Sequence, residues 1–274
     1  MVRSEGGVDS CLRIREANGL MQDRIAVFTS LKPMEGRAKA IQERSLANWQ
    51  DVFRGAAFVE FEGPLVPFAE MVEQVEQDSD ADVLIYANAD VLFDRKQVWT
   101  LCSPFYTQMP EILCGEFLLT GQRIDVLEDG SRRLHRPSGM DYFVFRRGMF
   151  HDLQRVVMGR AYCDNALLAY CLRRGVPVVD ASFALRVEHQ FHDYGHMAGG
   201  RKAVWEGDEA MANKLNNALR DFGPNVLDAT HTLLPDGRII PNIRKRPRCW
   251  ALWNFLTRGG KWWKNPKWPG VEGI

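Results

Sequence analysis

Short apolar runs alternate with helically spaced apolar positions along the first third of the chain. Residues 24–30 (RIAVFTS) and residues 57–62 have the length and the β-branched or aromatic content of buried strands. Apolar side chains recur at helical spacing between these runs, which predicts a helix over 37–53. A proline at the first turn begins a second predicted helix over 67–77. A third apolar run lies within residues 82–93 (DVLIYANADVLF), and strands separated by helices predict a parallel sheet.

The middle of the chain has longer alternating segments. Asp94 is expected to cap a short helix, and residues 112–126 form one long alternating segment. The turn residues at 128–130 (EDG) predict a hairpin, with residues 132–135 as its returning strand. Residues 142–145 alternate again and predict a further strand.

A helix and two strands complete the predicted regular structure. The helix is expected to begin at Asp164, a favourable N-cap residue, and to end at residues 173–175, where two arginines and a glycine are typical of a helix C-terminus. Residues 176–181 form the next strand, and the apolar segment 184–188 (ALRVE) leads directly to a histidine. The expected fold class is a mixed, mostly parallel α/β sheet flanked by helices.

Composition narrows the function classes. The 274 residues carry 35 basic and 35 acidic side chains, which argues against a nucleic-acid partner because neutralising phosphates needs a basic excess. Six cysteines without a close CxxC pair favour reduced thiols in a cytosolic protein. No apolar stretch reaches the length expected of a secretory signal or a membrane span. We expect a mobile leader over 1–21, one α/β domain over 22–235 and a C-terminal extension over 236–274.

The C-terminal extension concentrates positive charge and tryptophan. Residues 244–267 hold eight Lys or Arg and no Asp or Glu. Five of the eight tryptophans lie in or beside this stretch, namely Trp250, Trp253, Trp262, Trp263 and Trp268. Such interleaving is typical of a segment on an anionic membrane surface, where tryptophan takes the headgroup region and basic side chains meet lipid phosphates. The alternative is that the tryptophans pack on the α/β domain and the charges are solvated.

Two polar clusters carry the candidate metal chemistry. Asn88 and Asp90 end the third apolar run, and their spacing of two places both side chains on one side of an extended backbone. Their oxygens suit a hard divalent cation, and the alternative is that Asp90 simply caps the loop after the strand. The segment HQFHDYGH holds three of the chain's six histidines, and imidazole beside oxygen donors favours Mn2+ over Ca2+. The candidate metal ligands are Asp90, His189, His192 and His196.

The order of these motifs resembles that of glycosyltransferases with the GT-A fold. The matching features, over residues 25–230, are the strand that ends in Thr29 and Ser30, the ANAD motif, the SGMDYF loop, the GRAYCDNALL segment and the late histidines. In that superfamily a DxD motif and a late histidine hold a metal ion on the diphosphate of a nucleotide sugar. The resemblance implies a Rossmann-like GT-A domain, a Mn2+ or Mg2+ cofactor, and sugar transfer from a UDP-, GDP- or dTDP-sugar to a glycan or lipid-linked acceptor. The chain departs from the pattern at Asn88, where the DxD motif has aspartate.

The resemblance also implies roles for residues outside the metal site. The implied substrate-binding residues are Thr29, Ser30, Asn88, Gly139, Tyr142, Arg160 and Asn165. An inverting enzyme needs an aspartate to accept the proton of the attacking hydroxyl, and Asp164 is the first candidate and Asp141 the second. In a retaining enzyme, Asp164 would keep an orienting or structural role.

Two other functions remain open at this point. A sugar-phosphate nucleotidyltransferase would share the Rossmann-like sheet, although no Gly-rich phosphate loop with Arg and Lys follows the first strand. A catalytically inactive, carbohydrate-binding member of the fold would accommodate Asn88. The expected location is the cytoplasm, with the tail as a peripheral contact on the inner face of a membrane.

Overall fold

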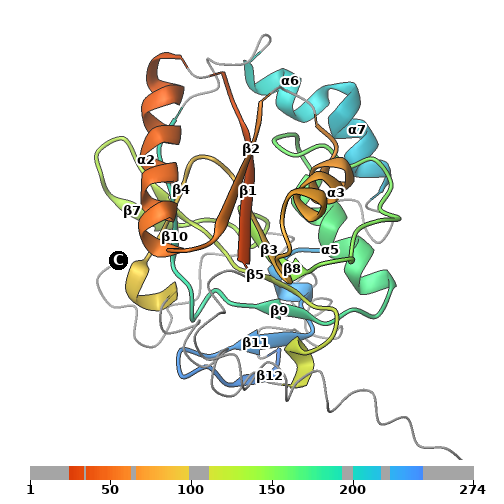
Figure 1. The fold of residues 1–274 in the computed structure, drawn as a ribbon. Helices are drawn as coiled ribbons and strands as arrows, with labels where there is room; N and C mark the ends of the chain where they lie inside the picture. Colours follow the sequence, from red (N-terminus) through yellow and green to blue (C-terminus); the bar gives the residue numbers. More distant parts are fainter. Residues whose placement is uncertain are drawn as a thin grey trace, which may run out of the picture.

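A large sheet forms the centre of the protein (Figure 1). The structure is a computed structural model that describes residues 25–33, 35–62, 66–98, 111–192, 200–216 and 223–242. The expected leader, His196 and the tryptophan-rich segment lie outside these residues. The strands of the large sheet are β1 (Ile25–Leu31), β2 (Ala57–Glu62), β3 (Val83–Ala87), β5 (Leu118–Thr120), β8 (Tyr142–Arg146), β9 (Val178–Asp180), β11 (His231–Leu233) and β12 (Ile239–Pro241).

The large sheet has the order β12-β11-β9-β5-β8-β3-β1-β2. Neighbouring strands run parallel except at β8, which is antiparallel to β3 and β5, and at the outer pair of β11 and β12. The parallel pairs of β1 with β2 and with β3 follow from crossovers through α2 (Gly36–Val52) and α3 (Phe68–Asp78). The predicted class, a mixed and mostly parallel α/β sheet flanked by helices, is confirmed.

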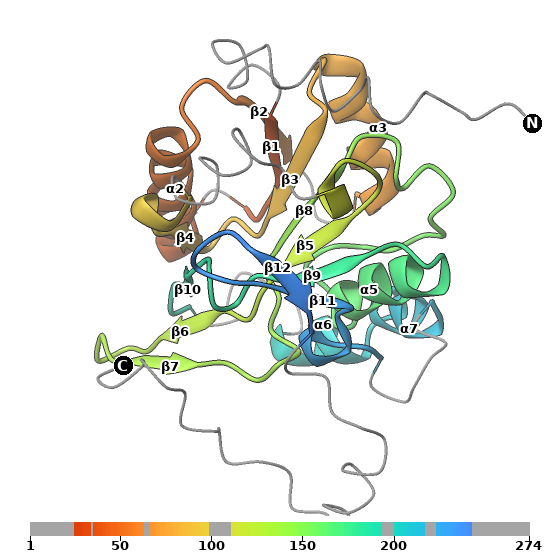
Figure 2. The same cartoon turned by 90° about the horizontal axis from the view of Figure 1, so that it is seen from below.

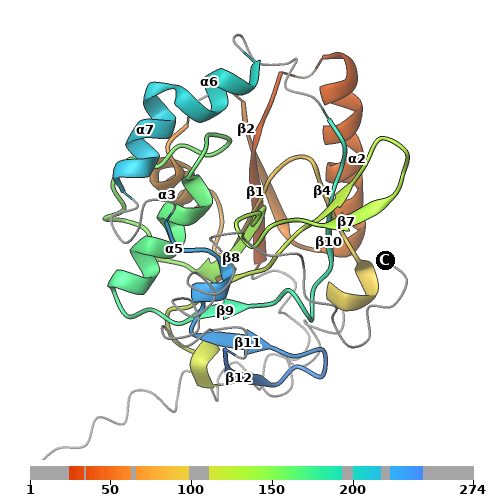
Figure 3. The same cartoon turned by 180° about the vertical axis from the view of Figure 1, so that it is seen from behind.

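A smaller sheet lies on the same side of the large sheet as α2 (Figures 1 and 3). Its strands, in spatial order, are β4 (Val91–Phe93), β10 (Val187–His189), β6 (Ile124–Val126) and β7 (Arg132–Leu134). The view from below shows the β6–β7 hairpin extending outward from the large sheet (Figure 2). The pair of β10 with β6 is parallel, whereas β10 and β4 are antiparallel.

Helix α5 (Cys163–Arg173) packs on the face of the large sheet opposite α2, in the apolar layer that α3 also covers. The described residues also include the helices α6 (Gly200–Glu206) and α7 (Asp208–Leu215), a helical turn over 95–98, and the 3-10 turns η2 (Glu111–Leu113) and η3 (Val226–Asp228). In the described part of the chain, no helix combines the length and the apolar character needed to span a membrane.

Alternating side chains of the central strands supply two apolar layers. In β1, Ala26 and Phe28 belong to the layer beneath α3 and α5, whereas Val27 belongs to the layer beneath α2. The same alternation continues through β3 and β8. Because both faces are covered, these strands are apolar at almost every position, as their sequence indicated.

The segment 112–126, predicted as one alternating segment, is divided between the two sheets. It contains part of η2, then β5 of the large sheet and β6 of the small sheet. A Cβ atom at Gly121, between the two strands, would lie 2.5 Å from the Tyr142 hydroxyl oxygen, so the crossing requires glycine. Periodicity did not show the change of sheet because strands of three residues are too short to display a period.

The cysteines depart in part from the expected reduced state. Cys114 is disulfide-bonded, whereas Cys163 and Cys171 are free thiols. The expectation of reduced thiols is therefore wrong at Cys114. Sequence spacing could not show this bond, because a disulfide needs two cysteines to be close in space rather than in the chain.

Helix α2 buries polar side chains on its inner face. Its buried residues are Gln42, Ser45 and Trp49, whereas the apolar side chains of Ile41 and Leu46 are half-buried. The helix was therefore predicted correctly over its length, but the face that it buries is more polar than its apolar positions indicated.

These polar groups fix the backbone of neighbouring loops. Gln42 accepts a hydrogen bond from the amide of Lys32 (2.6 Å) and donates one to its carbonyl (3.1 Å). Trp49 donates through Nε1 to the carbonyl of Val91 (3.0 Å). The buried serine of the same face accepts a hydrogen bond from the side chain of Gln190 (2.9 Å). Helix α2 therefore ties together three segments that lie far apart in the sequence.

Replacing Gln42 tests this role of α2. The Gln42→Leu variant loses two hydrogen bonds and leaves the amide and carbonyl of Lys32 without their partner, so the free energy of unfolding should fall by about 2–4 kcal/mol. Urea unfolding followed by circular dichroism measures the change. Gln50→Leu, at an exposed position of the same helix, is the matched control and should change it by less than about 0.5 kcal/mol. Equal stability of Gln42→Leu and the wild type would contradict the role.

Candidate functional site

A tight turn between the two sheets presents Asp90. The amide of Val91 donates to the carbonyl of Asn88 (3.2 Å) and closes the turn that joins β3 to β4. Strand β4 then pairs antiparallel with β10, with Val91 opposite His189. The amide of Gln190 donates to the carbonyl of Asp90 (2.9 Å) and continues this pairing. The register therefore places Asp90 beside the histidines at the end of β10.

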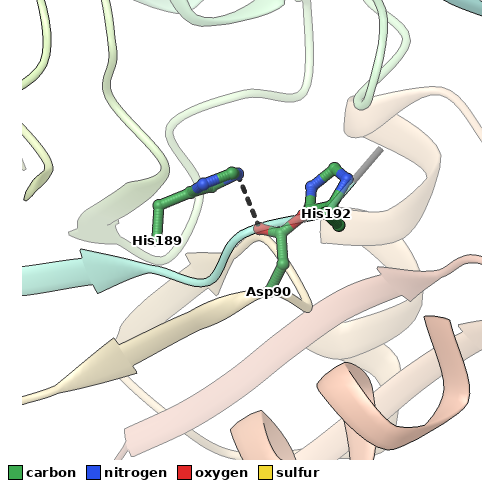
Figure 4. A group of neighbouring side chains, drawn as sticks. All are labelled: Asp90, His189 and His192. Atoms are coloured by element: carbon green, nitrogen blue, oxygen red, sulfur yellow. Dashed lines mark hydrogen bonds and ion pairs between the residues drawn. The ribbon is translucent and has the colours of Figure 1, made fainter. Parts of the chain in front are cut away.

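Asp90, His189 and His192 form a compact group (Figure 4). One ligand atom from each residue lies within 4.8 Å of the others. His192 Nε2 lies 3.0 Å from Asp90 Oδ2, and His189 Nε2 lies 3.7 Å from Asp90 Oδ1. The sequence predicted that Asp90 and the late histidines would lie at one strand edge, and the structure brings these two histidines there. His196 lies outside the described residues.

This donor set fits a divalent ion. Asp90 Oδ1 is buried and accepts no hydrogen bond within the described part of the chain, and such an oxygen is costly unless a ligand satisfies it. Burial lowers the pKa of His189, which favours the neutral imidazole that metal binding requires. Two imidazoles with one carboxylate suit a transition-metal ion better than Ca2+, which prefers oxygen ligands alone.

Asp90 is held in its ionised form. Burial alone would raise the pKa of Asp90, but the Lys32 ammonium and the imidazoles of His189 and His192 outweigh burial and hold it well below its usual range. The ammonium of Lys32 contacts Asp90 Oδ2 directly. Sequence reasoning gave Lys32 no role. The signal that could have found it is a lysine immediately after the first strand, at the edge where ligands bind in open α/β sheets.

The side-chain amide of Asn88 is hydrogen-bonded to neighbouring residues of the protein. Its Nδ2 donates to Asp141 Oδ1 (3.0 Å), and its Oδ1 accepts from the Tyr86 hydroxyl (3.1 Å). Arg123 Nη1 donates to both carboxylate oxygens of Asp141, at 3.0 and 2.8 Å. Asn88 therefore orients Asp141, and Asp90 is the residue of the ANAD motif that has an oxygen left for an ion.

Arg123 joins two carboxylates beside the site. Besides Asp141, it donates through Nε to Asp125 Oδ1 (3.0 Å), and Asp125 Oδ2 lies 2.8 Å from His135 Nδ1. Burial opposes ionisation of Asp125, but His135 and Arg123 outweigh it and lower the pKa of Asp125 to about 2. Sequence reasoning missed Arg123, although an arginine inside an apolar alternating segment was a signal of a buried charge with a partner.

Asp164 has the titration behaviour needed for proton transfer. Burial, followed by the negative charge of Asp141, raises the pKa of Asp164 to about 7. The Cys163 thiol donates to Asp164 Oδ1 (3.1 Å). The N-cap of α5 is Tyr162 rather than Asp164, which lies in the first turn. Tyr162 has a φ of 68°, in the left-handed region, and such strained residues cluster at functional sites.

The substrate-binding residues implied by the resemblance differ in accessibility. Thr29 and Tyr142 are 1% and 0% exposed, and within the described residues their hydroxyls have no hydrogen-bond partner. A Cβ atom at Gly139 would lie 2.2 Å from a ring carbon of His135, so the glycine permits close packing. Ser30 is half-buried at the end of β1.

Two further residues of that set flank the start of α5. Arg160 is half-buried, and its Nη1 donates to the carbonyl of Gly159 (3.1 Å). Asn165 is buried, and its Nδ2 donates to the carbonyl of Pro224 (2.6 Å). Asn165 therefore ties α5 to the segment before η3, whereas Arg160 and Ser30 lie where a ligand can reach them.

The raised pKa of Asp164 predicts a pH-dependent difference in stability. The folded protein favours the protonated carboxyl, so ionisation costs stability as pH rises from the ordinary value of 3.8 to about 7. The Asp164→Asn variant has no carboxyl at this position and so does not lose stability in this way. The free energy of unfolding of the variant minus that of the wild type should therefore increase as pH rises through this range, by at most about 4 kcal/mol. Urea unfolding at several pH values measures this, and a difference that does not vary with pH would contradict it.

Comparison with known proteins shows only distant likeness. No family model matches the chain, and no curated protein matches its sequence. GalNAc-T7, solved with UDP, GalNAc and Mn2+, is 11% identical with a TM-score of 0.40, and the match covers 61% of this chain and 44% of that one. The chain therefore spans less than half the length of that protein.

Two other solved structures match at similar levels. A glycosyltransferase involved in the glycosylation of the major capsid of PBCV-1 is 12% identical, with coverage of 56% of this chain and 68% of that one and a TM-score of 0.31. A197 from STIV is 12% identical, with coverage of 80% and 94% and a TM-score of 0.34. Glycosyltransferases are thus among the solved structures that this chain is similar to. At these levels of similarity, the function has to be inferred from the residues of this chain.

Proposed function

We propose that this chain is a metal-dependent glycosyltransferase that moves a sugar from a nucleotide-sugar donor to a glycan or lipid-linked acceptor. The observation that carries the proposal is the group of Asp90, His189 and His192 at one strand edge, with a carboxylate oxygen left for an ion. A second carboxyl, Asp164, titrates near neutral pH in the electrostatic neighbourhood of Asp141, which Asn88 of the ANAD motif contacts.

The donor would bind at the carboxyl ends of β1 and β3, where open α/β sheets bind ligands. Mn2+ or Mg2+ held by Asp90, His189 and His192 would stabilise the negative charge that develops on the departing nucleoside diphosphate. Ser30 lies at the carboxyl end of β1. We assign it to binding the nucleoside of a UDP-, GDP- or dTDP-sugar. Arg160 is an accessible cation that suits the anionic donor.

Asp164 would take the proton of the attacking hydroxyl. A pKa near 7 leaves part of this carboxyl ionised at neutral pH, which suits a general base. Asp141 is less suited to proton transfer because Arg123 occupies both of its oxygens. We therefore assign Asp141 to orienting its neighbours. If the reaction retains configuration, Asp164 would orient the acceptor instead.

The proposed acceptor is a surface or lipid-linked glycan at a membrane. Residues 244–267, which lie outside the described residues, combine eight basic side chains with tryptophan. That composition supports contact with an anionic surface, which would bring the enzyme close to a lipid-linked acceptor.

A donor panel tests the proposed function. The protein is incubated with UDP-, GDP- and dTDP-sugars and Mn2+, and release of nucleoside diphosphate is measured. Asp90→Asn should weaken Mn2+ binding and lower turnover by about 100-fold or more, because it removes the charged ligand. Asp164→Asn should lower turnover by about 100-fold or more while Mn2+ affinity stays unchanged. Asp51→Asn, at an exposed position, is the matched control.

The same assay separates the alternatives. Absence of metal-dependent turnover and of thermal stabilisation with every donor would contradict the glycosyltransferase proposal. Release of pyrophosphate from a nucleoside triphosphate and a sugar phosphate would identify a nucleotidyltransferase instead. Full activity of Asp90→Asn would remove the metal assignment.

Truncation tests the membrane contact. The cut should follow residue 243, because Asn242 donates to the carbonyl of Ala229 (2.7 Å) and belongs to the folded domain. The truncated protein should lose about 10-fold or more in affinity for vesicles that contain phosphatidylserine, since several basic side chains are removed. Sedimentation with vesicles measures this, with neutral phosphatidylcholine vesicles as the control. Unchanged binding would refute the contact.

A further inference from the structure

Lys32 places an ammonium group inside the candidate metal site. The residue directly follows β1, and its side chain is 25% exposed, so it reaches from the sheet edge into a buried cluster. Its Nζ contacts Asp90 Oδ2 and lies 3.3 Å from His192 Nε2. Asp90 and His192 both belong to the group that would ligate an ion. The ammonium and the ion therefore compete for the same two side chains.

The backbone of Lys32 is fixed, whereas its side chain is intrinsically flexible. Gln42 holds both the amide and the carbonyl of Lys32. Beyond this fixed point, lysine has a flexible stem of four carbons that carries a compact point charge. A change of occupant at Asp90 therefore requires movement of the ammonium alone.

A divalent ion and the Lys32 ammonium cannot both lie between Asp90 and His192. His192 Nε2 and Asp90 Oδ2 are 3.0 Å apart, and Lys32 Nζ contacts both. An ion within about 2.2 Å of these two atoms would lie close to the ammonium. Like charges at such a distance in a buried site repel strongly. Entry of the ion therefore displaces Lys32.

We propose that Lys32 is a displaceable counter-ion, which neutralises Asp90 in the ion-free protein, gives way to a divalent cation, and then binds phosphate oxygens of the donor. The last part rests on the proposed function. A buried carboxylate needs a compensating charge in every state, and the ammonium supplies it when the ion does not. The exchange keeps Asp90 neutralised throughout.

The two carboxylates that Arg123 joins already have basic partners. Within the described residues, Asp141 has both oxygens bonded to Arg123, and Asp125 is bonded to Arg123 and His135. A diphosphate that enters with the ion brings new anionic oxygens to the same edge. Phosphate is thus the anion class that Lys32 would take there.

Two titrations of Lys32→Met test the proposal. Methionine keeps an unbranched stem but removes the charge, so Mn2+ should bind about 10-fold or more tighter than to the wild type. With Mn2+ saturating, inorganic pyrophosphate should bind about 10-fold or more weaker, because its cationic partner is gone. Isothermal titration calorimetry measures both. Lys39→Met, at an exposed position of α2, is the matched control and should match the wild type in both titrations.

The opposite signs separate this role from loss of folding, which would weaken both ligands. Circular dichroism checks each variant, and Lys32→Gln repeats the titrations if Lys32→Met does not fold. Mn2+ affinity in a folded variant that equals or falls below that of the wild type would overturn the counter-ion role. Unchanged pyrophosphate affinity would overturn the phosphate role. Neither titration uses a sugar donor, so failure of sugar transfer would contradict the proposed function alone.

Discussion

The chain leaves the large sheet at Asn88 and enters the small sheet at Val91. The antiparallel pairing of β4 with β10 that begins there determines which residues lie beside Asp90. Val91 lies opposite His189, and the amide of Gln190 donates to the carbonyl of Asp90 (2.9 Å). A slip of one residue would turn the histidine to the other face. The buried polar face of α2 resists such a slip because it bonds both sides of this crossing. The geometry of the candidate metal site therefore depends first on backbone hydrogen bonds.

The carboxylates of Asp141 and Asp90 differ in how far their protein neighbours occupy them. Asp141 is closed, because Arg123 binds both of its oxygens. Asp90 is open, because one oxygen has no hydrogen bond within the described residues and the other contacts a lysine with a flexible stem. The fixed charge of Asp141 adds to burial in raising the pKa of Asp164 to about 7. The fixed charge of Asp141 thus shifts the titration of Asp164 towards neutral pH.

Sequence patterns predicted the central sheet and part of the cluster. An apolar run that ends in Asp90 and another that ends in His189 point to one edge, because strand ends of an open sheet lie together. The same argument was open for Lys32, which directly follows the first strand. It could not place Arg123, whose carboxylate partner Asp141 lies 18 residues away with no local pattern between them. The division of residues 112–126 between two sheets was missed because its strands are three residues long.

Pulsed electron paramagnetic resonance of bound Mn2+ tests the shared site of Asp90, His189 and His192 most directly. The spectrum of the wild type should show coupling to nitrogen from two imidazoles. His189→Ala and His192→Ala should each remove one of these couplings, and the double variant should remove both. Mn2+ that binds the wild type without nitrogen coupling, or with coupling that neither substitution changes, would contradict a metal site at this strand edge.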